Sequence, residues 1–253
     1  QYASQDLYIG RSIKETQAAA HLLSTEPYII SAGMGLIKSS DNIPSYDLTI
    51  QTGTASTIQS KIVEPIFPYE WWSELNKKLN KKNPIANLIN AHPNEIVLIA
   101  CAEVYIKLIE KDLETLSLEN LNRIRIFGPQ HPKKFPQSIQ NIIMPYDQRF
   151  DGPDGPIRGT RTDFAQRALL HFSKEIWINE PYPDALENHY ALVNNLMNKM
   201  RKPEIVKRIV LNDNEIIELV PKMWARAKGK SGRMLRVLRD QELVACEQQR
   251  FSN

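Results

Sequence analysis

The stretch YIISAGMGLIKSSDNIPSYDLT, residues 28–49, indicates an α/β fold with a pocket at the end of a strand. A short apolar run ends at Ser31, and small residues including Gly33 follow before a polar loop reaches Tyr46 and Asp47. Glycine adopts backbone angles that other residues avoid, and small residues allow a flat ligand to come close after a strand. We therefore predict that Ser31 and Gly33 form the floor of a substrate pocket beside Tyr46 and Asp47.

A second stretch, MPYDQR at residues 144–149, repeats the combination of proline, tyrosine and aspartate in a shorter form. It also follows an apolar run, which predicts a strand over 139–144 that delivers Asp147 and Arg149 into a loop. Because both strand ends carry a tyrosine and a carboxylate, we expect the two segments to face one site.

The run EIVLIACA, residues 95–102, predicts the clearest buried strand, of the type found in parallel sheets. Glu103 follows it, and α/β proteins place their chemistry at the carboxyl ends of such strands. A helix-capping role for this glutamate is the alternative. Residues 123–128 alternate in polarity, which predicts a strand at a sheet edge.

Charged residues at two predicted helix starts are further candidates for substrate binding. Arg11 and Ser12 precede the helical run 13–23, where free backbone N–H groups favour an anion; a capped helix start is the alternative. Asp163 precedes the helix 165–172 and could simply cap it. The loop before it carries more charge than turns require, so we assign Asp163 to the substrate site.

Composition limits the class of protein. The 253 residues are 42% hydrophobic and 24% charged, as in ordinary globular proteins, and no apolar run reaches the roughly 18 residues of a membrane span. Two cysteines favour a reducing cytoplasm. The sequence carries no phosphate-binding loop, dinucleotide-binding motif or zinc spacing, so we expect no cofactor and no metal, although ligands distant in sequence could still assemble a metal site.

The carboxyl-terminal tail is basic. Residues 199–253 hold thirteen Lys/Arg and seven Asp/Glu, a net charge of +6, which leaves −3 for the rest. We predict helices over 185–200, 203–210 and 215–224, followed by a glycine turn and a basic helix over 233–240. This outline is typical of helix-turn-helix and winged-helix DNA-binding regions, and a solvated helix that packs on the main domain is the alternative. The predicted DNA contacts are Lys228, Lys230, Arg233, Arg236 and Arg239.

Three blocks of the chain resemble a known family. Residues 31–49 are similar to the SGLYGVL and PYRLEMG blocks of the YaaA family of bacterial DNA-binding, peroxide-stress proteins, residues 71–75 resemble its FW helix, and residues 97–105 its VINLASDEYF strand. The blocks come in the same order and cover residues 7–107. Within this superfamily the chain looks most like the DpdC-type enzymes of bacterial DNA 7-deazaguanine modification. Archaeosine synthases carry a comparable block.

The resemblance implies a YaaA-like α/β domain over residues 1–180, with a mixed or parallel sheet flanked by helices. The tail lies outside the resemblance, and the winged-helix-like appendage over 185–253 is predicted from its helical pattern and basic charge alone. The activity it implies is hydration of the nitrile of 7-cyano-7-deazaguanine in DNA to the 7-amido base. Expected partners are DNA carrying this modified guanine and other DNA-modification proteins.

Nitrile hydration requires a base that activates water and an acid for the nitrogen. We predict Asp47 or Glu103 as the base, with a pKa raised by burial, and Tyr46 as the acid. Asp147, beside Arg149, would accept hydrogens from the guanine-type edge. A covalent thioimidate on Cys101 is an alternative route, and packing in the core is the simpler role for that cysteine.

Two other functions fit the same sequence. One is a non-catalytic DNA-binding protein of YaaA type in which only the tail is active. The other is a deoxyribosyltransferase or glycosylase-like enzyme, which would also use a pocket lined by tyrosine and aspartate.

Overall fold

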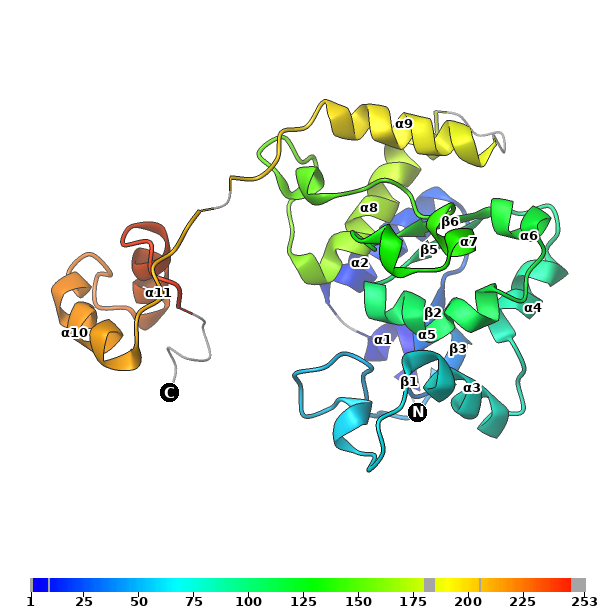
Figure 1. The fold of residues 1–253 in the computed structure, drawn as a ribbon, viewed down its shortest axis with the longest axis horizontal. Helices are drawn as coiled ribbons and strands as arrows, with labels where there is room; N and C mark the ends of the chain where they lie inside the picture. The colour runs from blue at the N-terminus through cyan, green and yellow to red at the C-terminus, as the bar shows by residue number, and fades with distance from the viewer. Residues whose placement is uncertain (1, 9, 180–184, 205, 247–253) are drawn as a thin grey trace. The chain divides into compact units, whose positions relative to one another are not determined.

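The computed structural model describes residues 2–8, 10–179, 185–204 and 206–246, and the chain divides into two compact units, Gln1–Pro203 and Glu204–Asn253 (Figure 1). The first unit is a mixed α/β domain with small sheets. Its strands are β1 (Tyr2–Ala3), β2 (Tyr28–Ser31), β3 (Gly35–Lys38), β4 (Asn42–Ile43), β5 (Val97–Ala100) and β6 (Ile124–Phe127). Its α-helices are α1 (Ser4–Leu7), α2 (Arg11–Leu22), α3 (Pro68–Lys78), α4 (Pro84–Ala91), α5 (Glu103–Leu113), α6 (Leu118–Asn122), α7 (Gln137–Gln140), α8 (Phe164–Phe172) and α9 (Leu186–Asn198). Short 3₁₀ turns are η1 (Ile58–Ser60), η2 (Pro132–Lys134), η3 (Gln148–Asp151) and η4 (Arg161–Asp163), and η5 (Ser173–Trp177) is a π-helical turn.

A parallel pair of strands forms the centre of the first unit. β5 pairs with β6 in the register Val97↔Ile124 to Ala100↔Phe127, and Ile126 forms a parallel bridge with Ile143. The strand predicted after residue 95 is thus confirmed, although it is shorter than expected and only Ile99 is buried, the other three residues being half-buried. The strand predicted over 139–144 is wrong in its first half, because α7 takes up Ile139 as a buried helical residue.

The placement of β6 at a sheet edge is also wrong. All four of its residues are buried, and the strand lies between β5 and the segment that contains Ile143. The alternation in polarity comes from Arg125, which is 1% exposed. Its guanidinium donates to the carbonyls of Asn122 and Ile124 and to His189, so the charge is buried with its donors occupied.

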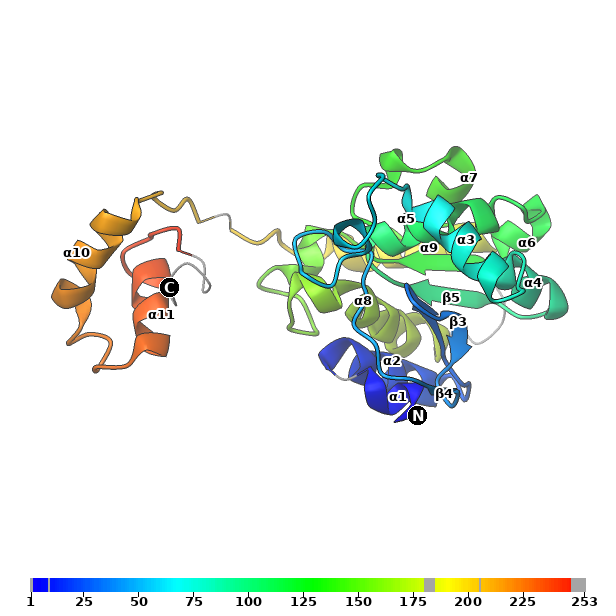
Figure 2. The same ribbon diagram turned by 90° about the horizontal axis from the view of Figure 1, so that it is seen from below.

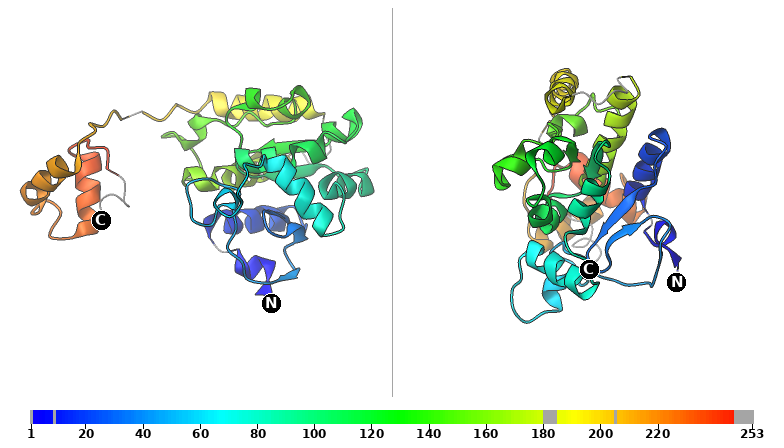
Figure 3. Two further views of the ribbon diagram at one scale, coloured as in Figure 1. Left: turned by 60° about the horizontal axis from the view of Figure 1, so that its bottom comes forward. Right: turned by 90° about the vertical axis from the view of Figure 1, so that its right-hand side faces the viewer.

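Helices cover both sides of the parallel pair (Figure 2). α8 packs on β5 and β6 and against α2, while α5 packs on the other side with α3 outside it. The same layers can be followed in Figure 3. This arrangement leaves the carboxyl ends of β5 and β6 between the starts of α5 and α8.

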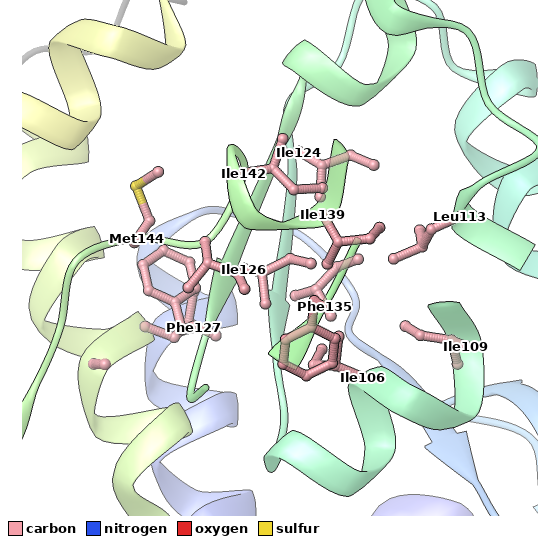
Figure 4. Close-up of a cluster of buried hydrophobic side chains, with 14 of the residues drawn as sticks. Ile106, Ile109, Leu113, Ile124, Ile126, Phe127, Phe135, Ile139, Ile142 and Met144 are labelled. Atoms are coloured by element: carbon pink, nitrogen blue, oxygen red, sulfur yellow. The ribbon is translucent and has the colours of Figure 1, made fainter. Parts of the chain in front are cut away.

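The core is a continuous cluster of aliphatic and aromatic side chains (Figure 4). Ile106, Ile109 and Leu113 of α5 recur every third or fourth residue, so they share one helix face. They pack with Ile124 and Ile126 of β6, and all five are fully buried. Burial of each such side chain contributes about 1.5–3 kcal/mol, so this face fixes α5 on the sheet.

The small-residue segment forms a tight β-hairpin between β2 and β3. Ser31 pairs with Gly35, and Gly35 adopts a positive φ of 71°. A Cβ at Gly35 would lie 2.9 Å from Asn76 Oδ1 of α3. The hairpin needs a glycine here for both reasons, because the backbone angle is left-handed and α3 approaches closely.

The second unit contains α10 (Asp213–Met223) and α11 (Ser231–Asp240) around a small apolar cluster. The helix predicted over 203–210 is wrong: Ile209 forms a parallel bridge with Val244, and backbone hydrogen bonds to residues 243 and 245 hold it extended. Residues 206–246, as described, contain two helices and this bridge, and no hairpin that would form a wing.

The observed boundary between the units also differs from the predicted one. α9 begins after the predicted linker, but its Val193 and Met197 are fully buried in the core of the first unit. The predicted linker residues 180–184 lie outside the described residues. Within the described parts of the chain, no helix has both the length and the apolar character needed to cross a membrane.

Replacement of Gly128 by alanine should destabilise the first unit strongly. Gly128 has φ 124°, and an added Cβ would lie 2.2 Å from the carbonyl oxygen of Cys101. Strain and overpacking each cost about 1–3 kcal/mol, so we expect a loss of about 3 kcal/mol in denaturant unfolding. Gly53 is a matched control, since it has φ 84° with no atom within 4 Å, and its alanine variant should show the strain cost alone. Equal losses in the two variants would contradict the steric argument.

Candidate functional site

Three hydroxyl groups meet at the carboxyl end of β2. Ser31 ends the strand, Tyr8 follows α1, and Tyr46 lies in the extended segment after β4. The Tyr8 hydroxyl donates to Ser31 Oγ at 3.0 Å, and the Tyr46 hydroxyl is hydrogen-bonded to both partners. We call Tyr8, Ser31 and Tyr46 the hydroxyl cluster. The structure thus brings together two residues of the quoted stretch, Ser31 and Tyr46, with Tyr8, which was not predicted.

The hairpin turn fixes the orientation of this cluster. Ser31 Oγ accepts hydrogen bonds from the backbone N–H groups of Gly33 at 3.2 Å and Met34 at 3.0 Å. Because Ser31 Oγ accepts these hydrogen bonds and one from Tyr8, its own proton is left for the Tyr46 hydroxyl. A Cβ at Gly33 would lie 2.7 Å from Cε2 of Tyr46, so glycine allows the Tyr46 ring to lie against the turn. The space beside Gly33 that was predicted to take a ligand is occupied by the Tyr46 ring.

The tyrosines around the cluster hold their protons firmly. Burial raises the pKa of Tyr8 well above its ordinary value, and the neighbouring Tyr46 adds to the shift. Burial likewise raises the pKa of Tyr105, which lies in the first turn of α5 with its hydroxyl 3.5 Å from Thr49 Oγ1. At neutral pH these phenols therefore stay protonated and can donate hydrogen bonds. Tyr105 was also missed; its position two residues after Glu103 was the available signal.

Cys101 follows β5 directly. Burial raises the pKa of its thiol well above the ordinary value. Since the thiolate is the nucleophilic form, this environment disfavours the covalent route considered for Cys101.

A cleft opens at the carboxyl ends of β5 and β6, with a volume of about 170 Å³. Its lining residues come from the starts of α5 and α8 and from the loop after β6: Ala102, Glu103, Gly128, Gln130, His131, Arg161, Thr162, Phe164 and Ala165. This is the edge at which α/β proteins bind ligands. Typical pockets for drug-sized ligands are about 300–1,000 Å³, so this cleft suits a smaller group.

Glu103 lies in this cleft as an ion-paired carboxylate. Lys134 Nζ lies 2.7 Å from one carboxylate oxygen, and His131 Nδ1 lies 3.3 Å from the other. Partial burial alone would raise the pKa of Glu103, but the hydrogen bonds from Lys134 and His131 outweigh it and lower the pKa below its ordinary value. The expectation of a raised pKa that suits a base is therefore wrong for Glu103, because these partners stabilise its charged form.

Asp147 and Arg149 form a local pair on the side of α9. The Asp147 carboxylate accepts from the backbone N–H of Arg149 at 2.8 Å and from its guanidinium at 3.0 Å, and Arg149 also donates to Asn198. The preceding Tyr146 is buried and hydrogen-bonded to His171 at 2.8 Å. Burial raises the pKa of Tyr146 and lowers that of His171, which keeps both groups neutral.

The two tyrosine–aspartate pairs do not form one constellation. Among the described residues of the first unit, no hydrogen bond, ion pair or ring contact joins the hydroxyl cluster to Tyr146 or Asp147. Tyr46 belongs to the hydroxyl cluster, whereas Asp147 is engaged by Arg149. Asp47 is exposed, and no described residue forms an ion pair or hydrogen bond with its carboxylate. The sequence repeat was therefore no sign of a shared site.

Asp163 is held by a fully buried arginine that the sequence analysis did not single out. Arg167 Nε donates to Asp163 at 2.6 Å, and its Nη atoms donate to Asp151 at 2.7 Å and to the carbonyls of Ile157 and Thr160. The signal was available, because Asp163 and Arg167 are four residues apart at a helix start. The dense charge of this loop thus serves its own folding.

Arg11, at the start of α2, contacts the same Asp163 carboxylate. Its guanidinium lies 3.6 Å from Asp163 and donates to the carbonyl of Arg158. Ser12 is half-buried in the first turn of α2. Arg11 therefore joins α2 to the loop before α8, a structural contact at a position predicted to bind substrate.

In the second unit, considered by itself, four of the five predicted DNA contacts are exposed: Lys228, Lys230, Arg233 and Arg236. Arg239 differs, because it is half-buried and donates to the carbonyl of Cys246 at 2.5 Å. This hydrogen bond therefore joins α11 to the segment that follows it.

Comparison of this chain with known protein families, curated proteins and solved structures found no match. Among the described residues, no three His, Cys, Asp or Glu side chains converge to hold a metal ion.

Replacement of Asp163 by asparagine should change stability in a pH-dependent way. Burial raises the pKa of this carboxyl, but the hydrogen bonds from Arg167 and Thr160 outweigh it and lower the pKa. A lowered pKa stabilises the fold above the unfolded-state value of about 3.9, and this stabilisation is lost as the pH falls below it. We expect Asp163→Asn to lose about 3 kcal/mol at neutral pH and to show a flatter decline in acid, measured by urea unfolding from about pH 6 to about pH 2.

The control for this experiment is Asp6→Asn, which removes an exposed carboxylate of the same unit. It should follow the wild-type profile. An unchanged acid decline in Asp163→Asn would show that the pair with Arg167 does not contribute to folding.

Proposed function

We propose that this chain hydrates the nitrile of 7-cyano-7-deazaguanine in DNA and gives the 7-amido base. The observation that carries the proposal is the hydroxyl cluster at the carboxyl end of β2, where Tyr8, Ser31 and Tyr46 offer protons beside the start of α5. The sequence resemblance to DpdC-type enzymes and to a YaaA-like fold supports the choice of substrate.

Hydration consumes one water and needs a proton donor for the nitrogen and a base for the water. Water adds to the nitrile carbon, and the nitrogen takes a proton from Tyr46, which is reprotonated from solvent through Tyr8 and Ser31. Asp47, exposed and not engaged by a described partner, receives the proton that the water loses and releases it to solvent. The imidic acid then tautomerises to the amide, so that only water is consumed.

Recognition of the base is assigned to the cleft at β5 and β6. Lys134 and His131 hold the Glu103 carboxylate in place, and a fixed carboxylate can accept from the N1–H and 2-amino groups of a guanine-type ring together. We move this role from Asp147 to Glu103 because Glu103 lines the cleft, whereas Asp147 does not. Gly128 and Phe164 also line this cleft.

The second unit would supply affinity for DNA. Its exposed Lys228, Lys230, Arg233 and Arg236 can contact phosphates, and this contribution depends on salt. A base in a duplex must also be turned out of its stack, which costs about a few kcal/mol. Phosphate contacts offset that cost without reading the sequence.

Removal of the Tyr46 hydroxyl should slow hydration. We expect Tyr46→Phe to lower kcat by about 100-fold or more, since positioned proton donors contribute about 10²–10⁴. The measurement is nucleoside mass spectrometry of DNA that carries the cyano base, before and after incubation with the protein. The matched control is Tyr190→Phe, which removes an exposed hydroxyl from α9 and should leave the rate unchanged.

The products of this assay separate the candidate functions. A gain of one water supports hydration, and a released base supports the glycosidic alternative.

Asp47→Ala should abolish turnover and leave DNA affinity nearly intact. An unchanged base in the presence of tight DNA binding would contradict the enzymatic proposal.

The second candidate is a DNA-binding protein without catalysis, and the exposed basic face of α11 favours it. For either candidate, the double variant Arg233→Gln, Arg236→Gln should reduce the slope of log affinity against log salt by about 0.9 for each lost phosphate contact. Arg226→Gln is the control, because Arg226 is already ion-paired with Glu242 at 2.6 Å. An unchanged slope in the double variant would exclude α11 from the DNA interface.

A further inference from the structure

An exposed tryptophan lies at the end of α10. Trp224 is 47% exposed, whereas Trp72 is 4% exposed and Trp71 and Trp177 pack against the core of the first unit. Trp224 takes no part in the apolar cluster of its own unit. A large aromatic side chain left in water marks a candidate contact surface.

The charge around Trp224 is of one sign. Residues 222–239 contain seven Lys/Arg and no Asp/Glu. Arg226 is paired with Glu242, and Arg239 donates to a backbone carbonyl. The other five are exposed, and no ion pair or hydrogen bond to another described residue engages their side chains: Lys222, Lys228, Lys230, Arg233 and Arg236.

The turn after Trp224 has a defined conformation. Gly229 N donates to the Trp224 carbonyl at 3.2 Å, and Lys230 N donates to that of Ala227 at 3.1 Å. Lys228 and Gly229 adopt positive φ values of 50° and 66°, which reverse the chain toward α11. The indole edge lies beside Gly229, where an added Cβ would be 3.7 Å from Nε1. Trp224, Lys228 and Lys230 therefore belong to one hydrogen-bonded turn, which leads into Arg233 and Arg236 of α11.

We propose that Trp224 stacks on an unpaired base of single-stranded DNA while the five free cations contact its phosphates. The inference rests on the proposed DNA binding of this unit and names the form of DNA bound. An indole stacks on a base face, and in a duplex those faces are covered by neighbouring bases. A protein partner is disfavoured, because five exposed cations that no described carboxylate engages match a polyanion.

The test is a binding titration of the full chain with a labelled oligothymidylate of about 20 nucleotides. Trp224→Ala should weaken binding about tenfold, whereas Trp224→Phe keeps an aromatic face and should retain most of the affinity. Ile217→Ala is the matched control, since Ile217 is 64% exposed on the same helix, seven residues earlier. It should bind as the wild type does. A duplex of similar length should bind Trp224→Ala and the wild type equally.

Three outcomes would overturn the proposal. Unchanged affinity of Trp224→Ala for the single strand would exclude stacking. Equal losses in Trp224→Ala and Ile217→Ala would mark an apolar docking face for protein. Equal losses on duplex and single strand would show that the ring does not distinguish them. The double variant Arg233→Gln, Arg236→Gln tests DNA binding by this unit separately from stacking by Trp224. If it binds the oligothymidylate as tightly as the wild type does, the basic face has no role in DNA binding.

Discussion

The parallel pairing of β5 with β6 is the constraint on which the first unit depends. It aligns Ala100 with Phe127, so that both chains leave the sheet at the same edge. Directly after the two strands, Gly128 lies so close to the Cys101 carbonyl that a side chain on residue 128 would overlap its oxygen. α5 must start at this edge, and its first turn therefore presents Glu103 to the cleft and Tyr105 toward the hydroxyl cluster.

Two buried arginines secure the surroundings of this edge. Arg125 and Arg167 are both at most 1% exposed, and each guanidinium donates to several oxygen or nitrogen acceptors. A buried charge is tolerated when its hydrogen bonds are made, and the loss of one partner leaves the other uncompensated. Arg167 thus determines the path of the charged loop before α8, and the carboxylates in that loop are engaged by folding before any ligand arrives.

Periodicity in the sequence was sufficient to predict the strand after residue 95 and the helices α8, α9 and α11, because each buries a regular apolar face. The pairing partners of each strand were harder to predict from the sequence. Arg125 gave β6 the alternation of an edge strand, since a sequence does not show that a guanidinium will be buried with its acceptors. The same limit affected the site: a Tyr–Asp pair at residue 146 looks like the pair at residue 46, yet one packs in the core and the other lies in the hydroxyl cluster. Tyr8 and Tyr105 reach that cluster only through tertiary contacts, which no spacing encodes.

For the proposed hydration, the protonation states of these side chains favour direct addition of water over a covalent intermediate. A thioimidate would require the Cys101 thiolate, and burial raises the pKa of that thiol. The neighbouring phenols of Tyr8 and Tyr105 also keep their protons, while the ion-paired Glu103 stays deprotonated because Lys134 and His131 lower its pKa. At neutral pH the region therefore holds neutral donors and a fixed anion, without a strong nucleophile of its own. Such a site can orient a ring and protonate a nitrogen, and the attacking oxygen must then come from solvent.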